Sequence, residues 1–334
     1  MDWFEELFGF AETSPEDVRS GIDVQGNCLV SRINGRKARF GRLEIASLAE
    51  LEDRLPGSDG VKRLTLSSII ADVSELHADP QNAGALFQAA SQFNLLEMAS
   101  PMISPESGVG IYGSDHTQGP ACAIACGAGT VYRNYFVPIR DQLGQTEETQ
   151  IDCLSEIGAS IQNDVHGYWR LQNGYAFAEA EGLIALNERL KFMSASEVEA
   201  LIRSLRIGVQ WHADVTLGSS QHRVTQAYCS ALPIGYSTVN ASHWKPFASL
   251  ILKSSYRATL AAAVLNAAET SNRTVFLTLV GGGVFNNPPE CIADAIVEAC
   301  QLYSAYDLDV KIVSFSSHLE TEQVIRRWER VRSD

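Results

Sequence analysis

The pattern of apolar positions is most regular in the last third of the chain. Residues 258–268 repeat apolar side chains at helical spacing, and residues 274–280 are mostly apolar without strict alternation. The second pattern is typical of a strand that is covered on both faces. An amphipathic segment at 288–303 and an apolar run at 310–315 follow, which together predict a right-handed βαβ unit with parallel strands. We expect Asn287 to cap the intervening helix, with Pro288 in its first position.

The earlier part of the chain carries shorter patterns. A hairpin is predicted at 28–45 around the turn Asn34-Gly35, and a short helix begins at Ser47, where Glu50 completes a capping box. Strands are predicted at 61–70 and 205–215 and helices at 150–161 and 197–205, while the run 85–90 fits a helix or a strand.

These elements predict an α/β fold in which a mixed sheet lies between helices. Residues 1–80 are expected to form an N-terminal elaboration packed on the core. Residues 81–334 are expected to form that core, with a helical insertion at about 138–225.

Charge narrows the classes of partner. The chain has 334 residues with 26 basic and 40 acidic side chains, so its formal net charge is 26 − 40 = −14. Nucleic acid is not an expected partner, because such surfaces need clustered Lys and Arg. A small anionic ligand remains compatible with this charge, since a local group of backbone N–H donors can bind phosphate on an acidic protein.

Cysteine spacing and hydropathy predict the compartment. Seven cysteines are scattered without CxxC or Cys/His spacing, so we expect free thiols and no metal site. No apolar run approaches the roughly 20 residues that span a bilayer. The acidic first ten residues also lack the basic start of a secretory signal. We expect a cytoplasmic protein without a membrane partner, or an intracellular one after delivery if it is an effector.

A triple glycine lies where a ligand loop is expected. Gly281, Gly282 and Gly283 follow the buried run 274–280 and precede the next helix. Ligands of open α/β sheets bind beyond the carboxyl ends of strands, and glycines let backbone N–H groups surround an anion. The loop lacks the Lys of a P-loop, and Asn286 stands in place of the third glycine of a dinucleotide fingerprint. The residues leave two interpretations, a diphosphate cradle and a tight turn without a ligand.

The segments around two such loops resemble one family. Gly281 to Pro288 has the form Gly-x-Gly-Val-aromatic-x-x-Pro, which is similar to the second phosphate loop of macrodomains. Asn94 and the small-residue segment 117–129 resemble a divergent first loop, in which Thr117-Gln118-Gly119-Pro120 replaces the usual Gly-Gly-Gly-Val. With the motifs at 90–98, 115–123, 132–135 and 229–233, the chain resembles an atypical macrodomain group. That group includes a bacterial effector that hydrolyses ADP-ribosylated ubiquitin, and the resemblance covers about residues 85–315.

The resemblance implies a fold and a ligand. The fold would be a macrodomain-like three-layer α/β/α mixed sheet with N-terminal and mid-chain elaborations, and ADP-ribose would lie across the sheet crest. No cofactor is expected, because ADP-ribose is the ligand or product. The implied ligand-binding residues are Asn94, Thr117, Gln118, Gly119, Gly281, Gly282, Gly283, Val284, Phe285 and Asn286.

The resemblance also implies chemistry at the distal ribose. A carboxylate there can position water and stabilise an oxocarbenium-like state. Asp115 is the first candidate, and Glu97 and Glu106 are further candidate acids. The structural alternatives are a loop-capping Asp115, salt-bridged or exposed glutamates, and a buried turn amide at Asn94. Arg133 either reaches a phosphate or anchors an acid of the middle region.

The expected function is hydrolysis of an ADP-ribosyl linkage on a protein side chain, with arginine among the candidates and an ADP-ribosylated protein as partner. The alternative is a non-catalytic reader of ADP-ribose or a related nucleotide metabolite. A partner-binding protein with a vestigial macrodomain and a cysteine hydrolase are further alternatives. The second is the weaker of these, because Cys229-Ser230 lacks a nucleophile elbow and is better explained as a core strand.

Overall fold

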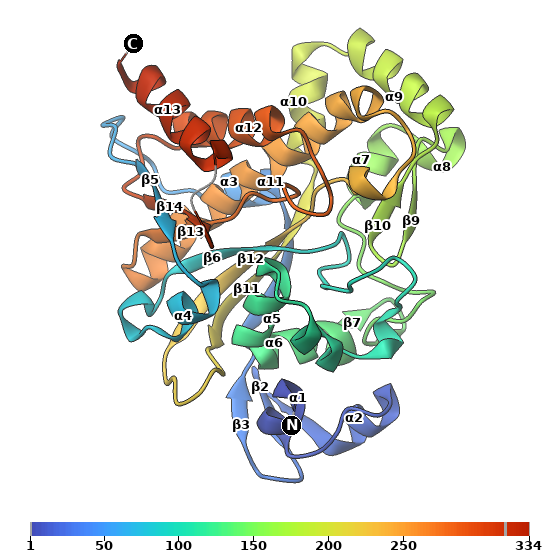
Figure 1. The fold of residues 1–334 in the computed structure, drawn as a ribbon, viewed down its shortest axis with the longest axis vertical. Coiled ribbons are helices and arrows are strands. Elements are labelled where there is room, and N and C mark those ends of the chain that lie inside the picture. The colour runs from blue at the N-terminus through green and yellow to red at the C-terminus, as the bar shows by residue number, and fades with distance from the viewer. Residues whose placement is uncertain (1, 317–318, 334) are drawn as a thin grey trace.

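The computed structural model describes residues 2–316 and 319–333, and this part of the chain contains a seven-stranded mixed sheet (Figure 1). Neighbouring strands from β12 to β5 are parallel, whereas β11 is antiparallel to both β12 and β4. In spatial order the strands are β4 (Arg42–Ser47), β11 (Arg206–Asp214), β12 (Arg223–Cys229), β6 (Leu86–Ala90), β13 (Thr274–Leu277), β14 (Asp309–Ser314) and β5 (Thr65–Ile70).

Helices cover both faces of this sheet (Figure 1). On one face lie α3 (Leu48–Glu52), the 30-residue α11 (Ala241–Thr270) and α12 (Pro289–Leu302), with α13 (Leu319–Ser333) beside α12. On the other lie α4 (Val73–Ala78), α5 (Gln118–Ala125) and α6 (Gly127–Val131). The predicted α/β fold with a mixed sheet between helices is therefore confirmed.

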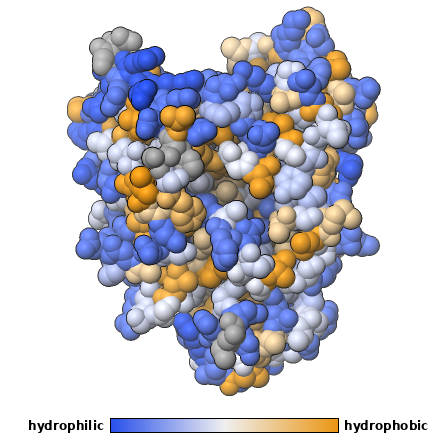
Figure 2. Space-filling view, in the orientation of Figure 1, coloured by the Kyte–Doolittle hydropathy of each residue, from blue (hydrophilic) through white to orange (hydrophobic). Residues whose placement is uncertain are grey.

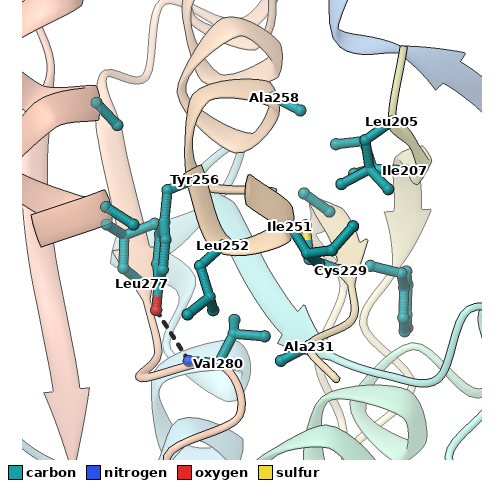
Figure 3. Close-up of a cluster of buried hydrophobic side chains, with 14 of the residues drawn as sticks. Leu205, Ile207, Cys229, Ala231, Ile251, Leu252, Tyr256, Ala258, Leu277 and Val280 are labelled. Carbon is teal, nitrogen blue, oxygen red and sulfur yellow. Dashed lines mark hydrogen bonds between the residues drawn. The ribbon is translucent and has the colours of Figure 1, made fainter. Parts of the chain in front are cut away.

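The main core lies between α11 and the sheet. Figure 3 shows Ile251 of α11 beside Cys229 of β12 and Leu252 above Val280, while Ala258 points toward Leu205 and Ile207. Burial of these apolar side chains is the main stabilising contribution here, at about 1.5–3 kcal/mol for each large one. Cys229 is 1% exposed, and its burial raises the pKa of the thiol to about 11. This position agrees with the core-strand interpretation of Cys229-Ser230.

Tyr256 of α11 links this core to the loop after β13. Its hydroxyl donates to the Thr278 carbonyl (2.8 Å) and accepts the Val280 N–H (2.9 Å), and Figure 3 shows the second bond. The Val280 N–H also donates to the Thr278 carbonyl (3.0 Å), so the hydroxyl adds a further bond to each of these two buried backbone groups. The glycine loop accordingly starts from a fixed point.

The N-terminal residues form a smaller unit on the face that carries α5 and α6. It consists of α1 (Trp3–Phe8), α2 (Pro15–Gly21) and a sheet of β1 (Ile22–Gln25), β2 (Cys28–Ser31) and β3 (Lys37–Arg39). Its apolar side chains share a second buried cluster with residues 96–136. The first 80 residues also supply both edge strands of the main sheet, β4 and β5. The division of the chain at residue 80 stays a prediction.

The segment between residues 138 and 205 adds hairpins and helices at one side of the molecule (Figure 1). These are β7 (Pro138–Ile139), β8 (Gln142–Leu143), α7 (Ser155–Ser160), α8 (Asn163–His166), β9 (Arg170–Gln172), β10 (Tyr175–Phe177), α9 (Ala180–Phe192) and α10 (Ala195–Arg203). The remaining part of the predicted insertion forms β11 and the start of β12.

Several predicted elements are confirmed. The unit β13–α12–β14 has parallel strands, the run 85–90 is a strand, and the strand predicted at 205–215 is β11. The capping box at Ser47 and Glu50 is present at α3.

Others are wrong in their bounds or caps. The helix predicted at 150–161 is only α7, because the side chains of Gln145 and Asp152 accept the N–H groups of Ile151 and Leu154, which therefore make no helical bonds. The hairpin pairs β2 with β3 through a loop at 32–36 rather than through two residues, and the chain then enters β4. Asn287 does not cap α12, because its side-chain amide donates to the Leu232 carbonyl (2.8 Å) instead.

Candidate active site

The glycine loop after β13 is fixed by hydrogen bonds within the loop, and one side of it is free of contacts with the described residues. The Asn287 N–H donates to the Gly281 carbonyl, and the Asn286 N–H donates to the Gly283 carbonyl (both 2.9 Å). Gly281 has φ +78°, and a Cβ added there would lie 2.4 Å from the Ala231 Cβ, so only glycine fits. A Cβ at Gly283 would meet no atom of residues 2–316 and 319–333 within 4 Å. The loop therefore presents free space on one side.

The same loop carries backbone donors without protein partners. Within residues 2–316 and 319–333, no hydrogen bond is made by the N–H groups of Gly281, Gly283, Val284 and Phe285. All four residues line a pocket of about 260 Å³. Consecutive free N–H groups at the end of a strand form a site suited to an anion.

The first turn of α5 faces this loop across the pocket. The Gln118 side chain donates to the Gln88 carbonyl (2.8 Å) and accepts the Ala90 N–H (3.1 Å), which fixes α5 at the carboxyl end of β6. A Cβ at Gly119 would lie 2.2 Å from the Ala90 carbonyl oxygen, so glycine permits this close approach. The start of α5 adds the positive end of its helix dipole to the same pocket.

Two pockets meet between the start of α5 and the loop after β13. The first and a second of about 420 Å³ share Thr117, Gln118, Thr278, Leu279 and Gly283 in their linings. The second pocket is mainly apolar, with walls that include Val73, Ile292, Val313, Phe315 and Val324. Figure 2 shows that this face of the molecule is hollowed near its centre. The site can hold an elongated ligand whose middle is anionic and whose one end is apolar.

Two carboxyl groups line the first pocket. Glu97 is 5% exposed, and its Oε1 has no hydrogen-bond partner among the described residues. Burial raises the pKa of Glu97 well above its usual range, an effect that the Arg133 charge opposes and the Asp115 charge reinforces. Asp115 is half-buried, and its Oδ1 accepts the Thr117 N–H (2.9 Å). The pocket thus pairs a buried carboxyl group of raised pKa with a second, half-buried carboxyl group.

Aromatic side chains form the remaining wall. Tyr175, Tyr236 and Phe285 have ring centroids 5.4–5.8 Å apart in tilted and edge-on pairs, and all three line the first pocket. The Tyr175 hydroxyl donates to the Met98 carbonyl (2.6 Å), which ties this wall to the segment that carries Glu97.

The structure brings together most of the predicted site residues. The first pocket is lined by Glu97, Asp115, Thr117, Gln118, Gly119, Gly281, Gly283, Val284 and Phe285, and Gly282 lines the second. Asp115 also makes the loop-capping bond of its structural alternative, so the two roles coexist.

Three predicted ligand-binding or catalytic roles are not supported by where the residues lie. Asn94 is fully buried outside both pockets, where its amide donates to Gln150 (2.8 Å) and its oxygen accepts the Leu96 N–H. Glu106 is exposed outside both pockets and accepts the Glu147 N–H (2.9 Å). Asn286 lies in the turn behind the loop with φ +52° and lines neither pocket.

Arg133 serves neither predicted purpose. It is fully buried, donates to the Leu95 carbonyl (3.1 Å), and lies 3.7 Å from the centroid of the Tyr228 ring. It therefore neither reaches the phosphate crest nor pairs with an acid of the middle region, and it acts on the site through its charge and its contact with Leu95.

Sequence reasoning missed Tyr175, Tyr236 and Thr278. Tyr175 belongs to the short hairpin β9–β10 and Tyr236 to the turn after Pro233, and neither segment carries a motif. Thr278 immediately follows β13, and the rule that ligands bind beyond strand ends was the one available signal for it.

The fold of this chain is similar to those of two solved structures. No family model matches the chain, and no curated protein matches its sequence. The poly(ADP-ribose) glycohydrolase of Thermomonospora curvata is similar, with 16% identity and a TM-score of 0.45 over 94% of this chain and 95% of that chain. The enzyme of Deinococcus radiodurans in complex with ADP-ribose has 14% identity and a TM-score of 0.45 over 87% of this chain and 94% of that chain. Because both TM-scores are below 0.5, the function proposed for this chain rests on its own pocket.

Among residues 2–316 and 319–333, no group of three or more His, Cys, Asp or Glu side chains is arranged to hold a metal ion. No helix in the same ranges is both long and apolar enough to cross a membrane.

Proposed function

We propose that this protein binds ADP-ribose across the two joined pockets and hydrolyses an ADP-ribosyl linkage on a protein side chain. The observation that carries the proposal is Glu97, a buried carboxyl group that lines the pocket and has an unpartnered oxygen. Burying such a group without a partner costs stability, so a function at this place is the better explanation.

Each part of ADP-ribose has a matching part of the site. The diphosphate would lie between the free N–H groups of the 281–285 loop and the start of α5. The adenosine would enter the apolar second pocket, and the distal ribose would enter the first pocket beside Glu97 and Asp115. Tyr175 and Phe285 would then pack on the distal ribose.

The two acids supply complementary steps. Glu97, kept protonated by its raised pKa, donates its proton to the leaving atom as the bond from that atom to the ribose anomeric carbon breaks. The Asp115 carboxylate stabilises the positive charge that develops on the ribose and accepts a proton from the attacking water. The water oxygen joins the anomeric carbon, which gives free ADP-ribose, and proton exchange with solvent restores both acids.

Arginine is the first candidate for the modified side chain, because Asp115 at the pocket mouth attracts a cationic group. The free cysteines, six buried and Cys28 half-exposed, fit the proposal of a reducing cytoplasmic setting.

The test combines binding and release. Calorimetric titration with ADP-ribose measures affinity, and release of ADP-ribose from arginine-linked and glutamate-linked peptides measures turnover. We expect Glu97→Gln to lower kcat by about 10²–10⁴-fold, because a positioned general acid contributes that much, while ADP-ribose still binds. Asp115→Ala should also lower kcat.

Glu106→Gln is the matched control, since it removes an exposed carboxylate outside both pockets and should leave kcat unchanged. Absence of ADP-ribose binding by the unaltered protein would refute the whole proposal. Binding without any release from either peptide would favour a non-catalytic reader of ADP-ribose.

A further inference from the structure

Both proposed acids are connected to one short segment. The 3-10 helix Gly110–Ser114 ends directly before Asp115. Its Tyr112 is 1% exposed, and the Tyr112 hydroxyl accepts the Glu97 N–H at 2.9 Å. Any movement of this segment would therefore shift the backbone of both acids together.

A single carboxylate from the N-terminal unit holds that segment. Glu12 Oε1 accepts the Val109 N–H (3.0 Å), and Glu12 Oε2 accepts the Gly110 N–H (2.5 Å). The Tyr135 hydroxyl donates to Oε1 as well (2.6 Å), which fixes the carboxylate from the other side. Charge-assisted bonds of this kind are about twice as strong as neutral ones.

Close packing reinforces the contact. A Cβ at Gly108 would lie 2.5 Å from Glu12 Oε2, and one at Gly110 would lie 2.9 Å from the same atom. Gly108 also has φ +87°, so the segment reaches the carboxylate in a conformation that favours glycine. Leu96, Met98, Val109 and Tyr112 share a buried cluster with Phe4 and Phe8 of the N-terminal unit.

We propose that Glu12 is a positioning residue, which sets the placement of Glu97 and Asp115 by anchoring the 109–112 segment. This inference rests on the proposed hydrolase function for its kinetic part. Glu12 lines neither pocket, so its effect is on the geometry of catalysis rather than on contact with the ligand.

The test variant is Glu12→Gln, in which one oxygen becomes an NH2 group. Wherever that group lies, it faces at least one backbone N–H of Val109 or Gly110, so a donor meets a donor. We expect kcat to fall about 10- to 100-fold, because displacement of catalytic groups by about 1 Å has effects of that size. KM and ADP-ribose affinity should stay within about twofold, since no ligand contact is lost.

Two controls separate positioning from general loss of stability. Ser31→Ala removes the buried bond from Ser31 to the Phe8 carbonyl (2.6 Å), which stabilises the same N-terminal unit without contacting the 109–112 segment. It should lower Tm and leave kcat unchanged. Glu16→Gln removes an exposed carboxylate that pairs with Arg19, and it should change neither quantity.

Amide hydrogen exchange gives a readout that does not depend on activity. In Glu12→Gln, exchange should become faster at residues 109–115 and at Glu97, and it should stay unchanged in α11. Unchanged exchange at these positions, or a fall in kcat for Ser31→Ala equal to that for Glu12→Gln, would overturn the inference. If the unaltered protein shows no hydrolysis, the proposed function fails, and the exchange comparison alone decides whether Glu12 positions the segment.

Discussion

Glu97 lies in a region where local bonds leave one oxygen free. The Glu97 backbone N–H donates to the Tyr112 hydroxyl, and the Glu97 side chain lines the pocket with Oε1 unpartnered among the described residues. Leu95, two positions earlier, has φ +65°. A non-glycine residue with positive φ marks local strain, and this one lies two positions before the proposed acid. Both the strained backbone at Leu95 and the unpartnered carboxyl group of Glu97 cost stability, and this cost is explained if residues 95–97 have a catalytic role.

The raised pKa of Glu97 has a consequence for stability against pH. A carboxyl group whose pKa is higher in the folded than in the unfolded chain stabilises the fold below its unfolded pKa, and loses that contribution as pH rises through its folded pKa. Glu97→Gln removes this dependence while keeping nearly the same shape. We expect the variant to melt at a higher temperature than the unaltered protein near pH 7, and the difference to shrink as pH falls toward about 4.5.

Thermal melting from about pH 4.5 to 8 measures this prediction. Glu106→Gln should melt like the unaltered protein across the range, because that carboxylate is exposed. A Glu97→Gln difference that is constant with pH would contradict the prediction, because it would mean that folding does not raise the pKa of Glu97.

For single residues, the sequence predicted Asp115 as the first candidate acid and Glu97 as a further one. It could not predict that Glu97 is the buried acid with the raised pKa, because that burial depends on tertiary contacts with Arg133, Tyr112 and the N-terminal unit. Asn94 was misassigned for the same reason. The hydrogen bond from the Asn94 side-chain amide to Gln150 joins residues 56 positions apart, and no local pattern encodes such a contact.

At the scale of elements, the 281–287 loop combines a rigid base with an open rim. Asn287, Tyr256 and Gly281 fix the base, while the rim from Gly283 to Phe285 keeps its N–H groups free. A loop made only of flexible glycines would have to be ordered when a ligand binds, at a cost in affinity.

Gly283→Ala tests the rim separately from the base. Its Cβ meets no atom of the described residues within 4 Å, so Tm should be unchanged, while the added methyl group enters space proposed for the diphosphate. We expect ADP-ribose to bind about tenfold more weakly, equivalent to about 1.4 kcal/mol, as measured by calorimetric titration.

Gly57→Ala is the matched control, because a Cβ there also meets nothing and the residue is exposed outside both pockets. Gly281→Ala should instead lower Tm, since its φ is +78° and its Cβ would meet Ala231. Unchanged affinity in Gly283→Ala would place the diphosphate elsewhere.

The sequence predicted this loop well because its information is local. A buried strand, three glycines and a proline lie within fifteen residues, and together they predicted β13, the loop and α12 in their correct order. The cap of α12 was wrong because the Asn287 side chain is used by the Leu232 carbonyl, a partner from a distant segment.

At the scale of the whole molecule, the binding site is proposed for an anion on a protein of net charge −14. Neither pocket is lined by Lys or Arg among the described residues, so backbone N–H groups would hold the diphosphate alone. The overall field of the protein should therefore oppose the ligand, and dissolved salt should screen that repulsion.

We expect the affinity for ADP-ribose to stay constant or to increase slightly as salt rises from about 50 to 300 mM, over which screening becomes short-ranged. Calorimetric titration at fixed pH measures this dependence, with the unaltered protein at low salt as reference. A strong loss of affinity with salt would instead require a cationic contact, which the two pockets do not provide.

The architecture of the sheet was only partly predictable from the sequence. The parallel centre follows from adjacent elements, but both edge strands come from the first 80 residues, for which the sequence predicts only an elaboration packed on the core. Strand β5 pairs with β14, and Thr65 donates to Asp309 across 244 positions of sequence. Pairing of this kind depends on tertiary contacts that no local pattern reveals.

That pairing also has a consequence during synthesis of the chain. At a translation rate of about 5–20 residues per second, β5 leaves the ribosome roughly 10–50 s before its partner β14 exists. During this interval an early strand has an unpaired edge in a nascent chain, which is a template for wrong pairing. Folding of the complete sheet can therefore finish only after the last strand is released, so this protein should depend on chaperones more than its size alone would suggest.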